Sequence, residues 1–492
     1  MSSVRRKNAP LPKPPLPVAK TFTDGAKTVD YLIQIYQEQT SYLQECFKLF
    51  VEKGTLPRQI RSFYPYVRFE LGPGLRRSIG SYAGLSHPGL YETTITRPTL
   101  FKDYLIKQID HILKNRGGTL QAGLGITPMP IHFAFDEGFH MEGDLSPEMQ
   151  TRLRQLFDMP DLSYMDDNIA NNRINLSEPQ PLALFTGPRT DYSLHRLKHY
   201  TGTSCEYFQQ FVLFTNYHFY LNQFVERAQE LMLDKKENYT GLVIPGDRII
   251  RPGEKLTHSR DKSFQMPAYH LMREDGCGVT MIDMGVGPAN ARTITDHVAV
   301  LRPQVWLMLG HCAGLRSTQR LGDYVLAHGF VREDRVLDEE LPVWVPVPAL
   351  AEIQKALERS VEIVAGCDED GRKKIMRTGT VMTTTNRNWE LEDQGPLVQR
   401  LGLSRAIALD MESGTIAANG FRLRVPYGSL LCVSDMPMEG TLKLPGMAQH
   451  FYKSQVDQHL EIGLCAMRIL RAMEPFRLHS RKLRGFNEHA FR

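Results

Sequence analysis

Carboxylate side chains follow two short apolar runs in the second half of the chain. Asp410 and Glu412 come after the run 406–409, and Asp435 comes after the run 430–433. Packing explains such residues poorly, because Asp and Glu are seldom buried without a partner. A carboxyl group whose pKa is raised by burial can donate a proton, and an ionised one can stabilise positive charge. These residues are therefore candidates for acid and electrostatic catalysis.

Glycine-containing segments follow three other apolar runs, at 246–248, 285–290 and 310–314. Glycine allows backbone N–H groups to approach an anion or a sugar closely, so these segments are candidate binding loops. The carboxylates also have a structural interpretation. Asp435 can cap the helix that follows it, and Glu412 can interact with the dipole of its own helix.

Two of these segments have features of cofactor or metal motifs. The segment 285–290 begins like a dinucleotide-binding fingerprint, but Asn290 stands at the third glycine and Pro288 interrupts the motif, which disfavours a cofactor role. His311 and Cys312 have the side chains of a metal or nucleophile pair. Adjacent residues of a strand point to opposite faces, however, so a polar loop is favoured there.

The elements that must position these residues are predicted to form an α/β sheet. Apolar runs without polar alternation indicate strands that are covered on both faces. Such runs lie at 241–245, 279–284, 305–309, 378–382, 406–409 and 430–433. Helical patterns lie at 290–301, 349–364, 411–420 and 450–473. Because ligands bind beyond the carboxyl ends of the strands in such a sheet, we expect the candidate residues to share one edge.

The first half of the chain mixes helices and strands without regular βαβ alternation. The predicted elements are helices at 24–54, 105–113 and 146–158 and strands at 67–71 and 131–135. Their boundaries come from hydrophobic periodicity and from stop signals such as Gly54. This order is typical of an α+β domain, which we place at residues 25–175.

The remaining segments complete the predicted organisation. The proline-rich residues 1–24 are predicted to be a disordered tail, and residues 176–235 a linker with a long helix over 204–233. We expect the aromatic side chains of that helix to pack a domain or subunit interface. The catalytic domain is predicted over 236–475, and the basic residues 476–492 are predicted to be a solvated tail.

Composition limits the classes of function. The chain of 492 residues has 42% hydrophobic residues, enough for a sizeable core, and a net charge of only +4, which does not indicate a nucleic-acid-binding surface. No run of about 18 apolar residues occurs, so no membrane span is expected. The seven cysteines contain no C-x-x-C pair, which favours neither a disulfide framework nor a zinc site. We expect a reduced, cytoplasmic protein.

A resemblance to a known family comes from the order of five motifs. They are G-V-G-P-A-N, L-G-H-C-A-G-L, L-G-D-Y-V, D-M-E-S and V-S-D. This order resembles that of the purine nucleoside phosphorylase and nucleosidase family over residues 240–470, and it implies a three-layer α/β/α domain. With its added N-terminal domain, the chain looks like the AMP nucleosidase family, whose members release adenine and ribose 5-phosphate from AMP.

The resemblance implies roles for individual residues. Asp435 stands where the family acid donates a proton to purine N7, and Glu412 where a glutamate holds the ribose 2′- and 3′-hydroxyls. Met411 completes the M-E pair, and Asp410 replaces the usual preceding glutamate. Trp389 is a candidate for packing against the base, although a buried core tryptophan explains it equally well.

The family also has a substrate-contacting loop after the third strand, which corresponds to Gly310 and His311. Phosphorolytic members carry an arginine two residues before this glycine, and the chain has Met308 there. Loss of a guanidinium that binds phosphate disfavours inorganic phosphate as the nucleophile and leaves water. Asp247 and His311 are both candidates for the base that activates water. A nucleoside phosphorylase and a non-catalytic nucleotide sensor remain the alternatives.

A nucleotide also needs a site for its 5′-phosphate, and the sequence offers two. The basic residues of the first are Arg248, Arg251, Arg260 and Lys262. They follow Gly246 in a loop that resembles the family motif G-D-P-x-x-R, although the proline is absent. The second is the segment 198–203, which includes Thr203 at the expected N-terminus of the long helix, where N–H groups favour an anion. An ordinary threonine N-cap explains that segment as well.

The resemblance has further implications for regulation and assembly. It implies that the chemistry needs no cofactor, that MgATP activates the enzyme and that phosphate inhibits it. It also implies a regulatory role for residues 25–175 and a homo-hexamer in which neighbouring subunits complete each site. Neither nucleic acid nor a membrane is an expected partner.

Overall fold

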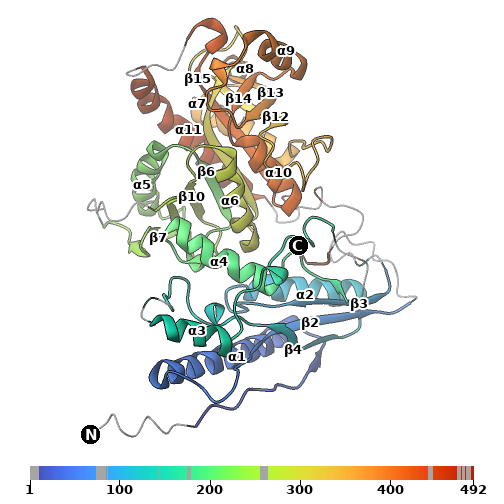
Figure 1. Cartoon of the computed structure of the whole chain (residues 1–492). Helices are drawn as coiled ribbons and strands as arrows, with labels where there is room; N and C mark the ends of the chain where they lie inside the picture. Colours follow the sequence, from blue (N-terminus) through green and yellow to red (C-terminus); the bar gives the residue numbers. More distant parts are fainter. Residues whose placement is uncertain are drawn as a thin grey trace. The chain divides into compact units, whose positions relative to one another are not determined.

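The computed structural model divides the chain into two compact units, Met1–Arg196 with Arg484–Arg492, and Leu197–Leu483 (Figure 1). The residues that the structure describes are 10–73, 85, 87–141, 143, 145–173, 179–254, 264–441, 447–473, 478, 483 and 489–491. The predicted fold class, a smaller α+β domain followed by a larger α/β domain, is confirmed.

The N-terminal unit is built on a five-stranded sheet. Its strands, in order across the sheet, are β1 (Lys20–Phe22), β4 (Leu120–Pro128), β2 (Phe63–Leu71), β3 (Gly89–Thr94) and β5 (Gln180–Pro181). Its helices are α1 (Gly25–Lys53), α2 (Lys102–Arg116) and α3 (Pro147–Leu156). Gly54, with φ of 74°, ends α1 as the sequence predicts. At the other end of the helix, the Asp24 side chain accepts a hydrogen bond from the N–H of Lys27.

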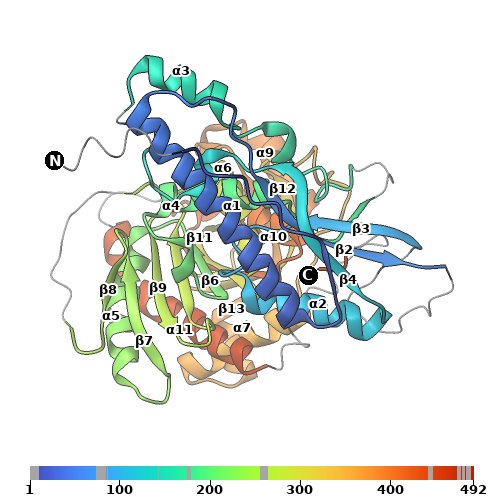
Figure 2. The same cartoon turned by 90° about the horizontal axis from the view of Figure 1, so that it is seen from below.

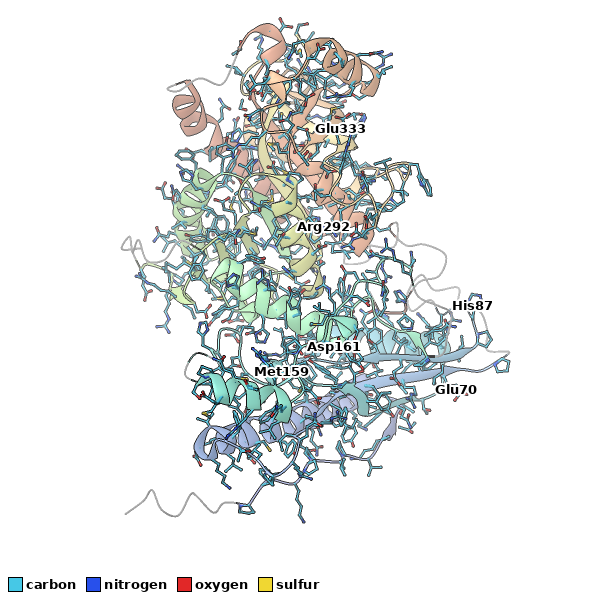
Figure 3. The ribbon with its side chains drawn as sticks, in the orientation of Figure 1. Glu70, His87, Met159, Asp161, Arg292 and Glu333 are labelled. Carbon is cyan, nitrogen blue, oxygen red and sulfur yellow. The ribbon has the colours of Figure 1, made fainter. Side chains whose placement is uncertain are left out.

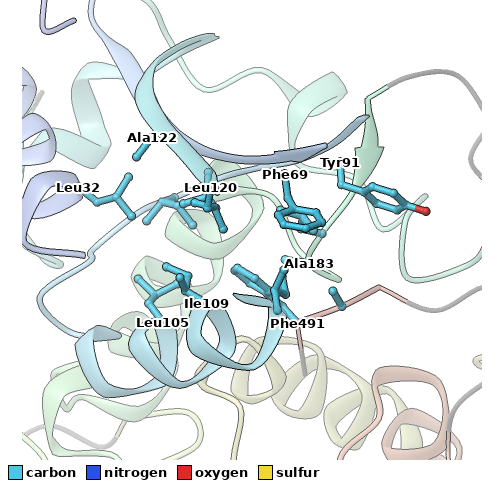
Figure 4. Close-up of a cluster of buried hydrophobic side chains, with 14 of the residues drawn as sticks. Leu32, Phe69, Tyr91, Leu105, Ile109, Leu120, Ala122, Ala183 and Phe491 are labelled. Atoms are coloured by element: carbon cyan, nitrogen blue, oxygen red, sulfur yellow. The ribbon is translucent and has the colours of Figure 1, made fainter. Parts of the chain in front are cut away.

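Apolar side chains of α1 and α2 form the core of this unit with the sheet. Figure 4 shows Leu105 and Ile109 of α2 beside Phe69 and Leu120 of strands β2 and β4. All four side chains are buried. The helical and two-residue periodicities of the sequence therefore identify the faces that meet in this core.

Residues 489–491 belong to the same core, so the prediction of a solvated C-terminal tail is wrong for them. Phe491 is only 1% exposed within the cluster of Figure 4, and its N–H donates to the carbonyl of Leu182 at 2.8 Å. A ring nitrogen of His489 lies 3.1 Å from the carbonyl oxygen of Pro181. The basic residues of the predicted tail lie outside the described residues; they are Arg477, Arg481, Lys482 and Arg484.

The proline-rich segment is ordered over residues 10–24, where a disordered tail is predicted. Strand β1 pairs antiparallel with β4, and the carbonyl of Pro15 accepts a hydrogen bond from Gln39 of α1 at 2.9 Å. The prolines do not prevent this packing, because the segment uses its carbonyl groups as acceptors. The rest of the predicted tail, residues 1–9, lies outside the described residues.

The strand expected at 131–135 is also wrong. Ile131–Ala134 forms a 3₁₀ helix, and the neighbouring strand is β4. Pro128 is the last residue of β4 and Pro130 precedes the 3₁₀ helix, and both lack the N–H that a continuing strand would donate.

The C-terminal unit contains one sheet of ten strands among the described residues. The order across the sheet is β14-β13-β12-β15-β11-β6-β10-β9-β7-β8. The bounds in chain order are β6 (Phe211–Thr215), β7 (Tyr239–Ile244), β8 (Arg248–Ile250), β9 (Ala268–Arg273), β10 (Val279–Asp283), β11 (Val305–Gly314), β12 (Tyr324–Glu333), β13 (Met376–Thr384), β14 (Ala408–Asp410) and β15 (Tyr427–Asp435). Because β14 also pairs with β11, the strands β11, β15, β12, β13 and β14 close into a ring.

Helices cover both faces of this sheet, which makes the three predicted layers. The helices are α5 (His218–Leu233), α6 (Pro288–Val298), α7 (Ala351–Ala365), α8 (Glu369–Ile375), α9 (Gln394–Ser404), α10 (Ser413–Leu423) and α11 (Met447–Ala472). Helix α11 packs against α5 and α7, whereas α6 packs against α10. Figures 1 and 2 show these groups on different sides of the strands. Arg292 of α6, labelled in Figure 3, donates to Glu340 at 2.5 Å and fastens α6 to the loop after β12.

The long helix predicted at 204–233 is wrong in its first half. Residues Phe211–Thr215 form β6, and only His218–Leu233 is helical. All five residues of β6 are buried in the sheet, so their aromatic side chains pack the core of this unit. A preceding helix, α4 (Gly187–Thr201), occupies part of the predicted linker, and the unit begins at Leu197 rather than at 236.

The other strands and helices predicted for the second half are present within a few residues of their expected bounds. The sequence analysis does not anticipate β9, β12, α8 and α9. Among the described residues, no helix combines the length and the apolar character needed to cross a membrane.

Candidate active site

Two loops and the start of one helix meet at a single edge of the C-terminal sheet. Strands β6, β10 and β11 run parallel, so their carboxyl ends lie at the same edge. The side chain of Glu412, at the start of α10, contacts Asn216 after β6 and Gly287 after β10. Two of the residues that the sequence predicts to share an edge, Glu412 and Gly287, are therefore in contact.

Glu412 is fully buried and held by two protein donors. Its Oε1 accepts from the N–H of Gly287 at 2.6 Å, and its Oε2 accepts from Nδ2 of Asn216 at 2.9 Å. Burial and the nearby charge of Asp410 raise the pKa of Glu412 to about 8, although both hydrogen bonds act to lower it. The site thus contains a carboxyl group that gains or loses its proton close to neutral pH.

Asp410 has a structural task in this arrangement. Its Oδ1 accepts from the hydroxyl of Thr383 at 2.6 Å, and its Oδ2 accepts from the N–H of Ser413 at 2.7 Å at the start of α10. Burial raises the pKa of Asp410, and these hydrogen bonds lower it. Asp410 therefore anchors the first turn of α10, while Met411 between the two carboxylates is half-buried.

Asp435 is the last residue of β15 and follows a bulge in the strand. The register between β15 and β11 shifts between Cys312 and Ala313, so Ser434 is an extra residue opposite β11. The hydroxyl of Ser434 lies 2.6 Å from Oδ1 of Asp435, and it is 3.3 Å from the carbonyl of Cys312. A bulge of this kind redirects the next side chain, which here is the carboxyl group of Asp435.

Asp435 and β14, the strand that leads to Glu412, lie on opposite sides of β11. Ala313 of β11 pairs with Leu409 of β14 on one side and with Asp435 of β15 on the other. Since neighbouring strands are about 4.8 Å apart, Leu409 and Asp435 are roughly 10 Å apart at this level. The ring of strands therefore places the two catalytic candidates, which are distant in sequence, at the same end of the ring. We call this end, where Asp435 and Glu412 lie, the mouth.

Gly310 and His311 lie in β11 beside this mouth. A Cβ atom on Gly310 would come within 2.6 Å of Met308 Cε, which would have to shift, and would lie 3.4 Å from Asn216 Oδ1. The ring of His311 packs edge-on against Tyr217, with centroids 5.1 Å apart. Both predicted residues are thus next to the segment that follows β6.

Asn216 is the residue that the sequence analysis misses. It follows the buried apolar run of β6, just as the other candidates follow their strands. This signal was available in the sequence, but the aromatic residues of 208–224 also fit a helical spacing, which hides the strand.

Trp389 lies in a hydrophobic cluster, in agreement with the alternative of a core tryptophan. Its buried neighbours include Met382, Leu397, Leu401 and Leu409. Met308 is also fully buried, in β11 between Phe214 of β6 and Ser429 of β15.

The arginines proposed for the 5′-phosphate are not brought to Glu412. Arg248 and Arg251 are exposed at β8, an edge strand four positions from β6, or roughly 20 Å along the sheet.

Asp247, a candidate for the base that activates water, is held by other residues. It accepts from the N–H of Ser204 at 2.7 Å and forms an ion pair with Lys198. Burial acts to raise its pKa, but these contacts lower it overall. Asp247 is therefore not near the position expected for water. Two other predicted residues, Arg260 and Lys262, lie outside the described residues.

The second predicted phosphate site, residues 198–203, lies at the negative end of a helix dipole, which disfavours an anion. Lys198 lies near the C-terminal end of α4, where the helix dipole is negative, and no helix N-terminus is formed there. Thr203 is fully buried, and its hydroxyl lies 2.8 Å from Nε2 of His270. Thr203 therefore belongs to a buried polar contact between segments of the sheet.

No group of three or more His, Cys, Asp or Glu side chains suited to a metal ion occurs among the described residues. The chemistry available at the mouth is that of carboxylates, backbone N–H groups and an amide.

Family models and relatives identify the chain. Residues 27–181 match the model described as "Bacterial AMP nucleoside phosphorylase N-terminus", and residues 252–462 match "Phosphorylase superfamily". The AMP nucleosidase of Escherichia coli K12 is 43% identical over 482 residues, which cover 95% of this chain and 98% of that protein. The chain belongs to the AMP nucleosidase family. The AMP nucleosidase of Escherichia coli O157:H7 gives the same values.

Solved structures of similar proteins match a little more than half of this chain. An AMP nucleosidase from Bacteroides thetaiotaomicron is 28% identical, covers 57% of this chain and 98% of its own, and has a TM-score of 0.43. A purine nucleoside phosphorylase from Toxoplasma gondii is 17% identical, covers 55% and 97%, and has a TM-score of 0.40. The family predicted from the five motifs is confirmed by the sequence relatives.

Proposed function

We propose that this chain hydrolyses the N-glycosidic bond of AMP to adenine and ribose 5-phosphate. The observation that carries the proposal is its 43% identity, over nearly the whole length, to the AMP nucleosidase of Escherichia coli. The presence of Asp435 and Glu412 at one mouth of the sheet supports it. A sensor that only binds a nucleotide would need neither a proton donor nor a group that stabilises positive charge.

In this proposal Asp435 is the general acid. Cleavage of the glycosidic bond moves electrons into the purine, so a proton delivered to N7 makes adenine a better leaving group. The bulge and the Ser434 hydroxyl fix the direction of the Asp435 carboxyl group before substrate binds. Such preorganisation saves reorganisation energy in the transition state.

Glu412 holds the ribose and stabilises the positive charge that develops on it. The N–H of Gly287 and the amide of Asn216 each use one lone pair of its carboxylate. A carboxylate offers about four acceptor sites, so both oxygens can still accept from sugar hydroxyls. An ionised Glu412 in this buried place also interacts strongly with an oxocarbenium-like sugar.

Water is the proposed nucleophile. Met308 is buried between two strands and offers no cation to inorganic phosphate, which supports hydrolysis over phosphorolysis. His311 is the better of the two candidates for orienting water, because it lies beside Gly310 whereas Asp247 is paired with Lys198.

The regulatory and assembly properties are proposed from the family resemblance. They are activation by MgATP, inhibition by phosphate, a regulatory N-terminal domain, a homo-hexamer and a cytoplasmic location. In a hexamer whose subunits complete each other's sites, Arg248 and Arg251 would serve the 5′-phosphate of a neighbouring copy. Their exposure on an edge strand supports this placement.

The test is to incubate the purified protein with AMP, adenosine or inosine, each with and without inorganic phosphate. Free adenine and ribose 5-phosphate should form from AMP without added phosphate. Cleavage that requires phosphate would instead identify a phosphorylase, and binding of AMP without any cleavage would identify a sensor.

A further inference from the structure

Asn216 is placed in the site by the register of the central strands. Phe214 of β6 pairs with Met308 of β11, so Asn216, two residues later, lies level with Gly310. The distance of 3.4 Å between Asn216 Oδ1 and a Cβ position on Gly310 agrees with this placement. The amide thus lies between a strand of the ring and the carboxylate of Glu412.

The two ends of the Asn216 amide have different surroundings. Its Nδ2 donates to Glu412 at 2.9 Å, which fixes the orientation of the group because a carboxylate needs a donor. Its Oδ1 is buried and has no hydrogen-bond partner among the described residues. Leaving a buried acceptor without a donor costs roughly 1–3 kcal/mol of free energy. We therefore expect a bound ligand to donate a hydrogen bond to this oxygen.

The ribose of the substrate is the group that we expect to bind next to Oδ1 of Asn216. This step rests on the proposed function, in which sugar hydroxyls reach the remaining lone pairs of Glu412. Oδ1 of Asn216 belongs to the same amide that binds Glu412, so a hydroxyl that donates to Glu412 comes next to it. The 2′- and 3′-hydroxyls of ribose are adjacent, and one can donate to the carboxylate while the other donates to the amide.

We propose that Asn216 is a ribose-binding and positioning residue, which orients Glu412 through Nδ2 and accepts a hydrogen bond from a ribose hydroxyl through Oδ1. The residue thereby makes the site specific for ribose over 2′- or 3′-deoxyribose. Loss of the hydroxyl leaves the buried Oδ1 unsatisfied again, which is the strongest basis for rejecting an analogue.

The experiment compares wild-type protein with Asn216→Ala and Asn216→Asp on AMP, 2′-deoxy-AMP and 3′-deoxy-AMP. For Asn216→Ala we expect kcat/KM on AMP to fall roughly 10-fold to 100-fold, the scale of one or two such hydrogen bonds. The fall should be clearly smaller for the deoxy nucleotide that lacks the contacted hydroxyl. An equal fall on all three nucleotides would mean that Asn216 does not contact the sugar, and would overturn the proposal.

Asn216→Asp is the variant that keeps the shape of the side chain. It retains an acceptor for the ribose but replaces the donor to Glu412 with a second carboxyl group. We expect the dependence of kcat/KM on the ribose hydroxyl to survive and the acidic limb of its pH profile to move to higher pH, because a nearby negative charge disfavours ionised Glu412. An unchanged pH profile would contradict the positioning role.

Binding of products separates this inference from the proposed reaction. Calorimetry on each protein should show that Asn216→Ala weakens ribose 5-phosphate several-fold more than 2-deoxyribose 5-phosphate or 3-deoxyribose 5-phosphate, while adenine binds as before. This result would support the ribose contact even if the wild-type protein failed to cleave AMP. If Asn216→Ala loses adenine binding and thus its fold, Asn216→Asp provides the same comparison of sugars. Equal binding of all three sugars to the wild-type protein would refute the contact between Asn216 and the ribose.

Discussion

The hydroxyl of Ser434 lies 2.6 Å from the carboxylate oxygen Oδ1 of Asp435, directly after a bulge in β15. Ser434 is the extra residue of the bulge, so the same irregularity supplies both the direction of Asp435 and a hydrogen-bond partner for it. The strand that carries the carboxyl group therefore also helps to orient it.

Asp435→Asn should nearly abolish turnover while KM for AMP changes only a few-fold. The amide keeps the shape of the carboxyl group and its contact with Ser434 but cannot deliver a proton, a loss of roughly 10²-fold or more in kcat. Steady-state release of adenine measures both constants. Wild-type kcat in this variant would remove Asp435 from the mechanism.

Glu412→Gln should remove an acidic limb from the pH profile of kcat/KM. In the wild-type protein, burial and Asp410 raise the pKa of Glu412 to about 8, so the ionised form that stabilises the sugar cation appears as pH rises toward that value. The variant should also lower kcat/KM at every pH. A profile identical in shape to that of the wild type would show that another group controls the limb.

The same carboxyl group should make the folded state less stable as pH rises. The pKa of Glu412 is about 8 in the folded protein, against an ordinary value of 4.5 for a glutamate, so the folded state binds the extra proton between these values. Stability contributed by that proton is present below pH 4.5 and is lost as pH rises through about 8. The decrease in melting temperature between pH 5 and pH 8.5 should be smaller in Glu412→Gln, and an equal decrease would argue against the raised pKa.

Gly287→Ala should impair catalysis through the backbone. Gly287 has φ of 112°, which L-residues rarely adopt, and its N–H donates to Glu412. The strain of roughly 1–3 kcal/mol should rotate this N–H and lower kcat/KM about 10-fold or more. Gly276→Ala is the matched control, since Gly276 has φ of 68° in the turn before β10 and open space around it. Equal losses of activity in both variants would point to instability alone.

Arg251→Ala should reduce the preference for AMP over adenosine by roughly 1.5–3 kcal/mol if this arginine binds the 5′-phosphate in a neighbouring copy. The ratio of kcat/KM values for the two substrates measures this preference. Mixed oligomers of Arg251→Ala and Asp435→Asn provide a second test, because one site in such an oligomer can receive both intact residues. Failure of mixing to restore AMP preference would argue against a shared site.

Phe491→Ala should destabilise the N-terminal unit. A fully buried phenylalanine truncated to alanine costs about 3–5 kcal/mol, from lost burial and the cavity that remains. Limited proteolysis and thermal unfolding should show earlier loss of residues 25–175, whereas Leu162→Ala, at a side chain that is 80% exposed, should change neither. Unchanged protection in Phe491→Ala would mean that the core tolerates the cavity.

The positions of the candidate carboxylates, Glu412 and Asp435, could be predicted from the sequence because two local signals coincide at them. Each follows a buried apolar strand, and each carries a charge that packing does not explain. Asn216 has only the first signal, and the aromatic residues of β6 also fit a helical spacing. The strand therefore looks like part of a helix until its partners β10 and β11 are known.

The arginines at β8 show what the local sequence cannot predict. The glycine before Arg248 gives a loop like that of the family, and nothing in the local sequence distinguishes an edge hairpin from a central strand. The distance of these arginines from Glu412 depends on the order β6-β10-β9-β7-β8, which is a property of the whole sheet. Likewise, the burial of Phe491 depends on core residues near the other end of the sequence, such as Val29 and Leu32.

The position of residues 489–491 in the N-terminal core has a consequence for biosynthesis. The sheet of that unit is complete in sequence by Pro181, but Phe491 leaves the ribosome only after the whole C-terminal unit has been made. The N-terminal unit is therefore synthesised first but completes its core last. Until Phe491 is made, the apolar side chains that pack against it stay partly exposed. Nascent chains arrested before residue 489 should thus bind chaperones through the N-terminal unit, even when their C-terminal sheet is already folded.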